Sequence, residues 1–385
     1  MILELLRLTG MLCTVVAGLH AAWWLLLALV ALPRRRMKAI IPGDESIAVV
    51  VPAHDEELMV GATIRSLQGA AEQHQGTVEI CVVADNCTDG TAELARAAGA
   101  TVFERHEPTR RGKGYALDFA LAELIARRSQ PDIVAFVDAD TVVSENFIAV
   151  IADRIRRGAQ VAQVYYAAGP GDEPIRRVRR LAFALVHWTR PLGASRLGLG
   201  TSLKGNGMAY RWHVAKEGLG GSGIVEDAEM SLLLASSGVV IAFEPRATVW
   251  GYMAANWNEA KVQDSRWERG RLALWRSALM SGARSVRRNP RAVNAALEVL
   301  SLPLVWVVCL ALAGLAIEWT SNGRPGLSGA VAGATIAYPI VGWVAARVSL
   351  SDLGAAVAVP LYMVHKLHTV LLASRPSGWR TTSRG

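Results

Sequence analysis

The stretch Ile133–Asp140, with the sequence IVAFVDAD, runs from an apolar segment directly into two carboxylates that lie one residue apart. A continuous apolar run of this length, preceded by Pro131, is typical of a strand that is buried on both faces. Alternate residues of an extended chain point to the same side, so Asp138 and Asp140 can face one cation. Open α/β sheets bind ligands at the carboxyl ends of their strands. The pair is therefore a candidate site, although a solvated turn would also explain it.

Strand and helix patterns alternate along the first half of the chain. Apolar runs at 46–51, 78–84 and 101–104 indicate three further strands, each followed by a helical pattern, and 239–243 indicates a later one. Such alternation predicts an α/β fold with a parallel, doubly wound sheet. Polar turns follow most of these strands, and a nucleotide would bind across the strand ends.

The composition limits the class of protein. The chain has 385 residues, of which 52% are hydrophobic, and its formal net charge is +8. The basic residues stand beside apolar runs, which indicates cytoplasmic membrane flanks and membrane lipids rather than a nucleic-acid partner. The four cysteines show neither metal-ligand spacing nor a disulfide framework, which fits a domain in a reducing compartment.

Three apolar runs are long enough to cross a bilayer as helices. They cover residues 8–32, 299–317 and 327–346, and the basic segment Arg34–Arg36 follows the first. By the positive-inside rule, the N-terminus lies outside and the segment after these arginines lies in the cytoplasm. A fourth apolar segment, 353–372, is interrupted by a proline, a lysine and two histidines. This pattern favours an interfacial helix and leaves a further crossing open.

These runs predict three parts and a protein integral to the membrane, with a bacterial inner membrane as the expected location. They are an N-terminal transmembrane anchor (1–36), a cytoplasmic domain with interfacial helices (37–297), and a C-terminal transmembrane hairpin with an interfacial helix and a basic tail (298–385). Segment 176–190 mixes arginines with bulky apolar residues, which fits a helix on a membrane surface and an ordinary amphipathic helix equally well. The basic stretch 263–291 is expected to lie against the cytoplasmic leaflet.

Four motifs occur in one order: Asp85, then Asp138-Ala139-Asp140, then Glu226-Asp227, then Gln263-Asp264-Ser265-Arg266-Trp267. This series resembles the D, DxD, ED and QxxRW motifs of membrane-embedded family 2 glycosyltransferases, the relatives of cellulose, chitin and hyaluronan synthases. The resemblance covers residues 46 to 270. It extends to the first strand and its turn, although Asp55 stands where that family usually has Asn. It implies a Rossmann-like GT-A domain with transmembrane helices at both ends.

The resemblance also implies inverting sugar transfer from a nucleotide sugar, with a UDP-sugar as the expected donor and Mg²⁺ or Mn²⁺ as the cofactor. Asp138 and Asp140 would bind the ion, with Asp140 the more direct ligand, because carboxylates and substrate phosphates usually hold such cations together. The ion would neutralise the leaving diphosphate. By resemblance, Asp227 is the base that accepts the proton of the acceptor hydroxyl. A helix N-cap is an alternative or additional role for Asp227.

The implied donor side comprises residues near three strand ends, namely Glu57, Asp85, Lys113 and Asp138. Asp85 would accept hydrogen bonds from the nucleoside, and an Asx-turn is its alternative role. Lys113 lies between two glycines at an expected helix start, where an ammonium and backbone N–H groups suit an anion. A solvated surface lysine is the alternative there.

The implied acceptor or diphosphate side comprises Asn206, Glu226, Gln263, Arg266 and Trp267. Trp267 offers a flat apolar face for a sugar ring, while Arg266 and Gln263 can reach the diphosphate. A membrane-interface tryptophan is the alternative for Trp267. A backbone turn alone would explain Asn206, which is flanked by Gly205 and Gly207.

The acceptor stays open at the level of sequence. Three crossings line a polymer channel poorly unless subunits combine into a homo-oligomer, which favours single addition to a lipid-linked or glycolipid acceptor in polysaccharide or glycolipid biosynthesis. The QxxRW motif favours a processive polysaccharide synthase of the cellulose, chitin, hyaluronan or poly-GlcNAc type. A third interpretation, an inactive membrane-anchored regulator that binds nucleotide sugars, conflicts with the intact Asp138, Asp140 and Asp227.

Overall fold

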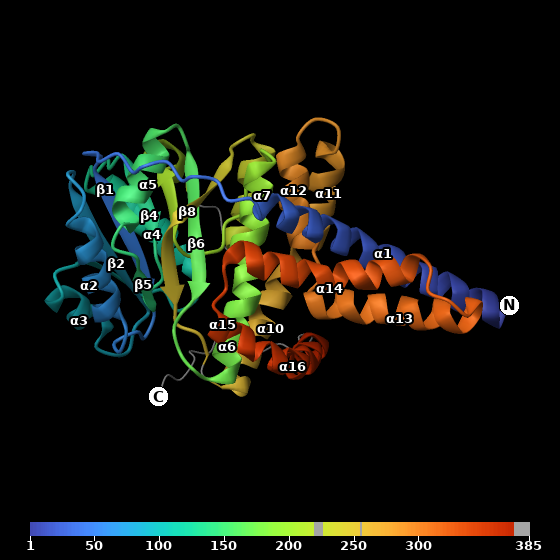
Figure 1. Cartoon of the computed structure of the whole chain (residues 1–385). Coiled ribbons are helices and arrows are strands. Elements are labelled where there is room, and N and C mark those ends of the chain that lie inside the picture. The colour runs from blue at the N-terminus through green and yellow to red at the C-terminus, as the bar shows by residue number, and fades with distance from the viewer. Residues whose placement is uncertain (219–225, 255, 373–385) are drawn as a thin grey trace.

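The computed structural model describes residues 1–218, 226–254 and 256–372 of the chain. An α/β domain lies at one end, and long apolar helices project from it (Figure 1). The strands are β1 (Ile47–Ala53), β2 (Val78–Asp85), β3 (Thr101–Arg105), β4 (Ile133–Phe136), β5 (Thr141–Val143), β6 (Val161–Ala168), β7 (Met208–Arg211) and β8 (Ile241–Gly251).

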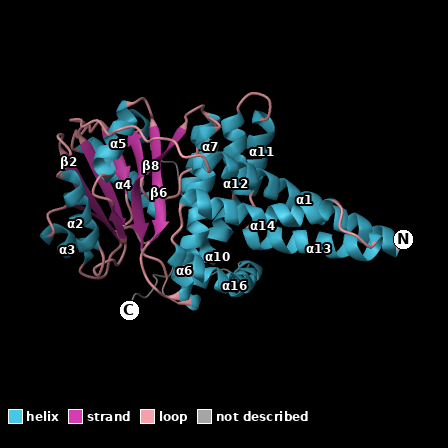
Figure 2. Ribbon diagram, viewed as in Figure 1, coloured by secondary structure: helices cyan, strands magenta, loops and turns pink. Residues whose placement is uncertain are grey.

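Helices of the α/β domain alternate with these strands. They are α2 (Val60–Ala71), α3 (Thr91–Ala97), α4 (Lys113–Ala126), α5 (Phe147–Arg156), α8 (Trp212–Ala215) and α9 (Glu226–Ser236). The other helices connect this domain to the apolar bundle or form the bundle itself (Figure 2). They are α1 (Ile2–Ala31), α6 (Pro174–Phe183), the π-helical segment η1 (Ala184–Thr189), α7 (Arg190–Arg196), α10 (Trp257–Ala273), α11 (Trp275–Ser285), α12 (Pro290–Leu300), α13 (Leu304–Asn322), α14 (Leu327–Ala346), α15 (Leu350–Leu353), the 3₁₀ segment η2 (Gly354–Ala358) and α16 (Val359–Leu372).

The eight strands form one mixed sheet in the order β3-β2-β1-β4-β7-β6-β8-β5. The expected α/β fold is confirmed, and β3, β2, β1 and β4 are parallel as predicted. The second half departs from the prediction, because β7 is antiparallel to both β4 and β6, and β5 is antiparallel to β8. Strands β5 and β7 have three and four residues and, unlike the four-residue β4, do not lie in a longer apolar run of the sequence.

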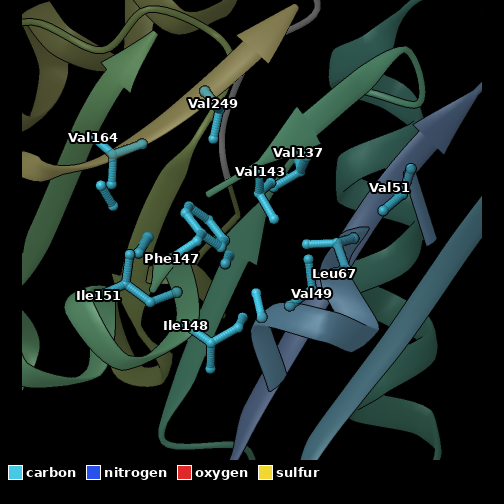
Figure 3. Close-up of a cluster of buried hydrophobic side chains, with 14 of the residues drawn as sticks. Val49, Val51, Leu67, Val137, Val143, Phe147, Ile148, Ile151, Val164 and Val249 are labelled. Carbon is cyan, nitrogen blue, oxygen red and sulfur yellow. The ribbon is translucent and has the colours of Figure 1, made fainter. Parts of the chain in front are cut away.

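Both faces of the sheet are packed, which explains the continuous apolar runs of its central strands. On one face, Val49 and Val51 of β1 lie among Leu67 of α2 and Phe147 and Ile151 of α5 (Figure 3). All five side chains are fully buried. On the other face, α4 covers β1, β2 and β4 with a second apolar cluster. The strand ends are therefore rigid supports for the polar turns that follow them.

Three helices, α1, α13 and α14, are long and apolar enough to cross a membrane. Helix α1 packs along both of the others, and it runs from the far tip of the bundle to the side of the sheet (Figure 1). Small residues permit the close approach, since a Cβ at Gly314 of α13 would collide with Thr14 of α1. These helices agree with the three crossings that the sequence predicts.

A rod formed by α6, η1 and α7 lies between the sheet and the apolar bundle. Arg196 at its end donates hydrogen bonds to the carbonyls of Val30 and Ala31, which are 2.8 and 2.7 Å away. These bonds satisfy carbonyls at the end of α1, which have no partner within the helix. Arg179 in the same rod is only 1% exposed. Segment 176–190 is thus packed between the sheet and the helices of the C-terminal part.

Helix α16 packs beside α10 and not within the apolar bundle (Figure 1). Its 14 residues span about 21 Å, which is shorter than the roughly 30 Å of a bilayer core. The rings of His365 and Trp257 lie 5.0 Å apart, and the Lys366 ammonium lies 3.1 Å from the Asp264 carboxylate. These contacts fit the interfacial helix that the sequence favours.

Candidate active site

A cavity of about 1040 Å³ begins at the carboxyl ends of β1, β2 and β4 and reaches the first turn of α13. Its wall at the strand ends includes Asp85, Lys113, Asp138, Asp140, Glu226 and Asp227. Its wall near the apolar helices includes Leu302, Pro303, Leu304, Val305 and Trp343. Gln263, Arg266 and Trp267 line it between these ends. The structure thus brings most of the sequence-predicted site residues into one enclosure.

The two carboxylates of the Asp-x-Asp motif follow β4 in a tightly held turn. The backbone N–H of Asp138 donates to Asn206 Oδ1 at 3.2 Å, and the carbonyl of Asp140 accepts from Tyr252 N at 3.1 Å. The Lys113 ammonium donates to Asp138 Oδ1. The Asp138 carboxylate is therefore already paired with a cation, which is the side-chain ammonium of Lys113.

Lys113 occupies the first position of α4 and connects the two acidic motifs. Its ammonium donates to Asp138 and to the carbonyl of Gly205, and it lies 3.9 Å from the Glu226 carboxylate. Burial alone would lower the pKa of Lys113, but the charges of Asp138 and Glu226 outweigh that effect and raise the pKa. The side chain is a fixed ammonium in the cavity wall rather than a solvated surface lysine.

Glu226 and Asp227 lie in the first turn of α9, so Asp227 is inside the helix rather than at its N-cap. Asp227 Oδ1 accepts from the backbone N–H of Ala228 at 2.8 Å. Burial raises the pKa of Glu226 to about 7 and also raises the pKa of Asp227, while Lys113 opposes both shifts. A carboxylate with a raised pKa is a better proton acceptor near neutral pH than an ordinary one.

Asp85 and Glu57 stabilise the loops at the ends of β1 and β2. Asp85 is 3% exposed, and its Oδ1 accepts from Arg105 Nη1 at 2.6 Å and from Asn86 Nδ2 at 2.8 Å. Asp85 therefore forms a buried ion pair with Arg105 instead of the Asx-turn that was its alternative role. Glu57 Oε2 accepts from Gly90 N at 2.9 Å, and Glu57 is not among the residues that line the cavity. Glu57 therefore stabilises the loop, and its position does not favour contact with the donor.

Asn206 lies behind the Asp-x-Asp turn rather than in the cavity. Its side chain is fully buried, its Oδ1 accepts from Asp138 N, and its Nδ2 donates to Thr141 Oγ1 at 2.7 Å. Both polar atoms of the Asn206 amide are thus hydrogen-bonded to the turn that carries the two carboxylates. Direct contact of Asn206 with an acceptor conflicts with this burial, and a positioning role fits it.

The Gln-x-x-Arg-Trp segment lies on α10 and is organised around Arg179, a residue that no sequence motif marks. Arg179 donates to Gln263 Oε1 at 2.5 Å and to Asp264 Oδ1 at 2.6 Å. Its guanidinium also lies 5.8 Å from the ring centroid of Trp267. Trp267 packs against Phe183 and the main core, so it is not simply a tryptophan at a membrane interface. The arginines of segment 176–190 were the available sequence signal.

Replacing Arg179 with Met should destabilise the protein by about 3–5 kcal/mol, because the change leaves Asp264 buried without its guanidinium partner. Both side chains of this pair are 1% exposed, so water cannot substitute for the lost contact. Lys366 still faces Asp264 and should keep the loss near the lower value. Urea unfolding in detergent measures the effect, with the exposed Arg287→Met as the matched control. Equal midpoints for the two variants would disprove a stabilising role.

A second set of polar residues lines the cavity between the acidic motifs and the apolar helices, and no sequence motif marks it. His187 Nδ1 hydrogen-bonds the carbonyl of Tyr166 at 3.1 Å. Arg190 Nε donates to the Tyr338 hydroxyl at 2.8 Å, and Lys204 pairs with Glu298 at 2.7 Å. These residues come from η1, α7, α12 and the loop before β7, and only the folded chain brings them together.

One further group of potential metal ligands, Asp55, Cys87 and Asp89, lies within 4.8 Å among the described residues. Asp55 is already bonded to Thr88, and Asp89 to Thr91. Burial raises the pKa of the Cys87 thiol to about 11, so it stays protonated at neutral pH. This chemistry fits a hydrogen-bonded loop and not a metal centre.

Comparison with known proteins agrees with this geometry. Residues 42–270 match the family model described as glycosyltransferase like family 2, so the chain belongs to that family. The chain is 23% identical over 237 residues to the probable glycosyltransferase YdaM of Bacillus subtilis (strain 168), covering 58% of this chain and 54% of that protein. The residues that the family model matches include the Asp-x-Asp, Glu-Asp and Gln-x-x-Arg-Trp motifs.

Shorter matches involve relatives with named substrates. The glucosyl-3-phosphoglycerate synthase of Mycolicibacterium paratuberculosis is 41% identical over 103 residues, which are 25% of this chain and 29% of that one. The 4,4'-diaponeurosporenoate glycosyltransferase of Staphylococcus aureus (strain USA300) is 32% identical over 105 residues, 27% of this chain and 26% of that one. The chain thus spans about half, or less, of the length of these relatives.

A solved structure resembles almost the whole chain. The mannosyltransferase PcManGT from Pyrobaculum calidifontis, in complex with GDP-Man and Mn²⁺, matches with a TM-score of 0.60 and 17% identity. The match covers 96% of this chain and 100% of that one. At this identity the likeness concerns the fold alone. It confirms the expected GT-A α/β domain with apolar helices at both ends of the chain.

Proposed function

We propose that this protein is a membrane-bound, metal-dependent, inverting glycosyltransferase that adds one sugar to a lipid-linked or glycolipid acceptor at the cytoplasmic face. The observation that carries the proposal is the continuity of the cavity from Asp138 and Asp140 to Leu302–Val305 and Trp343. Val305 and Trp343 belong to two of the three helices that are apolar enough to cross a membrane. An acceptor that is anchored in lipid can therefore meet the donor without leaving the bilayer.

Asp138 and Asp140 suit a divalent cation. Their carboxylates are the hard oxygen ligands that Mg²⁺ and Mn²⁺ prefer, and Asp138 already faces the ammonium of Lys113. The fold relative PcManGT is in complex with Mn²⁺, which supports a divalent ion at this position. When bound, the ion would act as a Lewis acid on the donor diphosphate.

The protein's own residues would bind the donor and move one proton. Lys113 and Arg266 line the cavity as cations and would hold the diphosphate, while Asp85 would limit the nucleoside pocket at the end of β2. Asp227 would accept the proton of the acceptor hydroxyl, and Trp267 would place the acceptor sugar. With one base and no assigned protein nucleophile, the proposed reaction is a single displacement that inverts the sugar carbon. A UDP-sugar stays the expected donor, and a GDP-sugar is the first alternative because PcManGT is in complex with GDP-Man.

The domain boundaries follow from the same proposal. The segments 1–36 and 298–385 would anchor the enzyme, and 37–297 would face the cytoplasm. In the structure, α1 begins at the tip of the bundle and ends beside the sheet (Figure 1). This direction is consistent with an N-terminus on the far side of the membrane.

Release of nucleoside diphosphate should depend on added membrane lipid if the acceptor enters from the bilayer. Delipidated enzyme in detergent should turn over its donor slowly, and total membrane lipid should raise the rate at least about tenfold, because water is a poorly positioned acceptor. Chelation of the divalent ion should abolish both rates. A lipid-independent rate of the same size would contradict a lipid acceptor.

A further inference from the structure

Arg190 lies in the wall of the cavity and forms no ion pair with a carboxylate among the described residues. Its Nε donates to the Tyr338 hydroxyl at 2.8 Å, and its guanidinium lies 4.0 Å from the ring centroid of Trp24. Within the part of the chain that the structure describes, the Arg190 side chain forms no ion pair and no other hydrogen bond. Its two terminal nitrogens are therefore available for a ligand, while aromatic side chains from α1 and α14 fix the orientation of the group.

The neighbouring charges leave an excess of positive charge. Lys204 pairs with Glu298 at 2.7 Å, and the Arg271 guanidinium pairs with Glu268. All four of these side chains line the same cavity as Arg190. Lys204 and Arg271 thus each have a carboxylate partner, while Arg190 shares the charge of Glu298 with Lys204 and forms no close ion pair among the described residues. A half-buried charge of this kind destabilises the folded protein unless an anion binds to it.

The residues around Arg190 contribute further contacts besides its positive charge. The Lys204 ammonium also contacts Ser202 Oγ at 2.8 Å, which fixes it at the cavity wall. The Oε2 atom of Glu298 accepts from both Lys204 Nζ and Ser202 Oγ, which holds the three side chains together. The apolar residues Leu302 and Leu304 line the same cavity. The enclosure therefore combines two cationic side chains with an apolar wall that continues into α13.

We propose that Arg190 and Lys204 form a subsite for a phosphate group that is part of the membrane-lipid acceptor. The planar guanidinium suits two oxygens of a phosphate, and Lys204 adds a second charge. The lipid chain would extend along Leu302 and Leu304 toward α13. This inference rests on the proposed function, because it names the class of lipid that the same cavity would accept.

Binding of radiolabelled dodecyl phosphate tests the subsite. The full-length protein is placed in phosphatidylcholine nanodiscs, and binding to empty nanodiscs is subtracted. Saturable binding that an excess of dodecanol or inorganic phosphate does not displace supports the proposal. Equal competition by dodecanol would reduce the site to an apolar groove, and equal competition by inorganic phosphate would make it a small-anion site. Either result overturns the proposal without any variant.

Variants then test the residues. Arg190→Gln should weaken dodecyl phosphate binding at least about tenfold, because charge-assisted hydrogen bonds are lost, and Arg190→Lys should weaken it less. The matched control is Arg287→Gln, an exposed arginine that does not line the cavity, and it should bind normally. Unchanged binding by Arg190→Gln would overturn the assignment.

Nucleoside diphosphate binding with Mn²⁺ is measured in parallel on every sample. Normal nucleotide binding by Arg190→Gln shows that this variant is folded, so its loss of dodecyl phosphate then reports on the subsite. Failure of the wild type to bind any nucleotide would instead refute the proposed transferase chemistry. The two proposals can therefore fail separately.

Discussion

Sugar transfer by Asp227→Asn is expected to fall by about 10²–10⁴-fold, which is the usual contribution of a general base. The substitution keeps the shape of the side chain and its contact with Ala228 N, but removes the group that can accept a proton. Nucleotide binding should stay nearly intact, because Asp138 and Lys113 are unchanged. A radiometric transfer assay with a parallel nucleotide-binding titration measures both effects.

The control is Glu229→Gln, a carboxylate on the same helix that does not line the cavity, and it should keep full activity. Burial raises the pKa of Asp227, so the folded state favours the protonated carboxyl. Stability should then increase as the pH falls through the folded pKa, and the neutral Asn should not unfold the protein at neutral pH. Retained transfer by a folded Asp227→Asn protein would show that the base is elsewhere.

Asp140→Ala should weaken metal-dependent nucleotide binding by about 100-fold or more, because the variant loses one of two carboxylate ligands and a bound metal contributes several kcal/mol of charge stabilisation. The metal-independent part of binding should not change. Titration of nucleoside diphosphate with Mn²⁺, and again with chelator, separates the two contributions.

Asp172→Ala is the matched control, since Asp172 is exposed and lies outside the cavity. It should bind nucleotide with the same metal dependence as the wild type. If Asp140→Ala behaves like this control, Asp140 is not a metal ligand, and Asp138 together with the donor phosphates would have to hold the ion.

The sequence was most informative where burial is continuous. Strands β1, β2 and β4 are packed on both faces, so their apolar runs and the polar turns after them could be located without a structure. Strands β5 and β7 were not predicted because, unlike the four-residue β4, neither lies in a longer apolar run that ends in a polar turn. Their antiparallel pairing follows from how the chain returns to the sheet, which local patterns do not encode.

The candidate site likewise contains residues that a sequence motif marks and residues that only the folded chain brings together. Asp138, Asp140, Asp227 and Trp267 were found because motifs mark them, and the structure gathers them around one cavity. Arg179 was missed because its partners, Gln263 and Asp264, lie more than eighty positions later in the chain. Arg190 was missed for a related reason, since its aromatic supports come from helices α1 and α14.

The products of the reaction test the central claim most directly. Purified enzyme in nanodiscs would receive radiolabelled UDP- and GDP-sugars, Mg²⁺ or Mn²⁺, and total membrane lipid. The account predicts a labelled product that extracts into organic solvent and carries one added sugar. A water-soluble product of high mass that forms without added lipid would contradict it and identify a processive polysaccharide synthase.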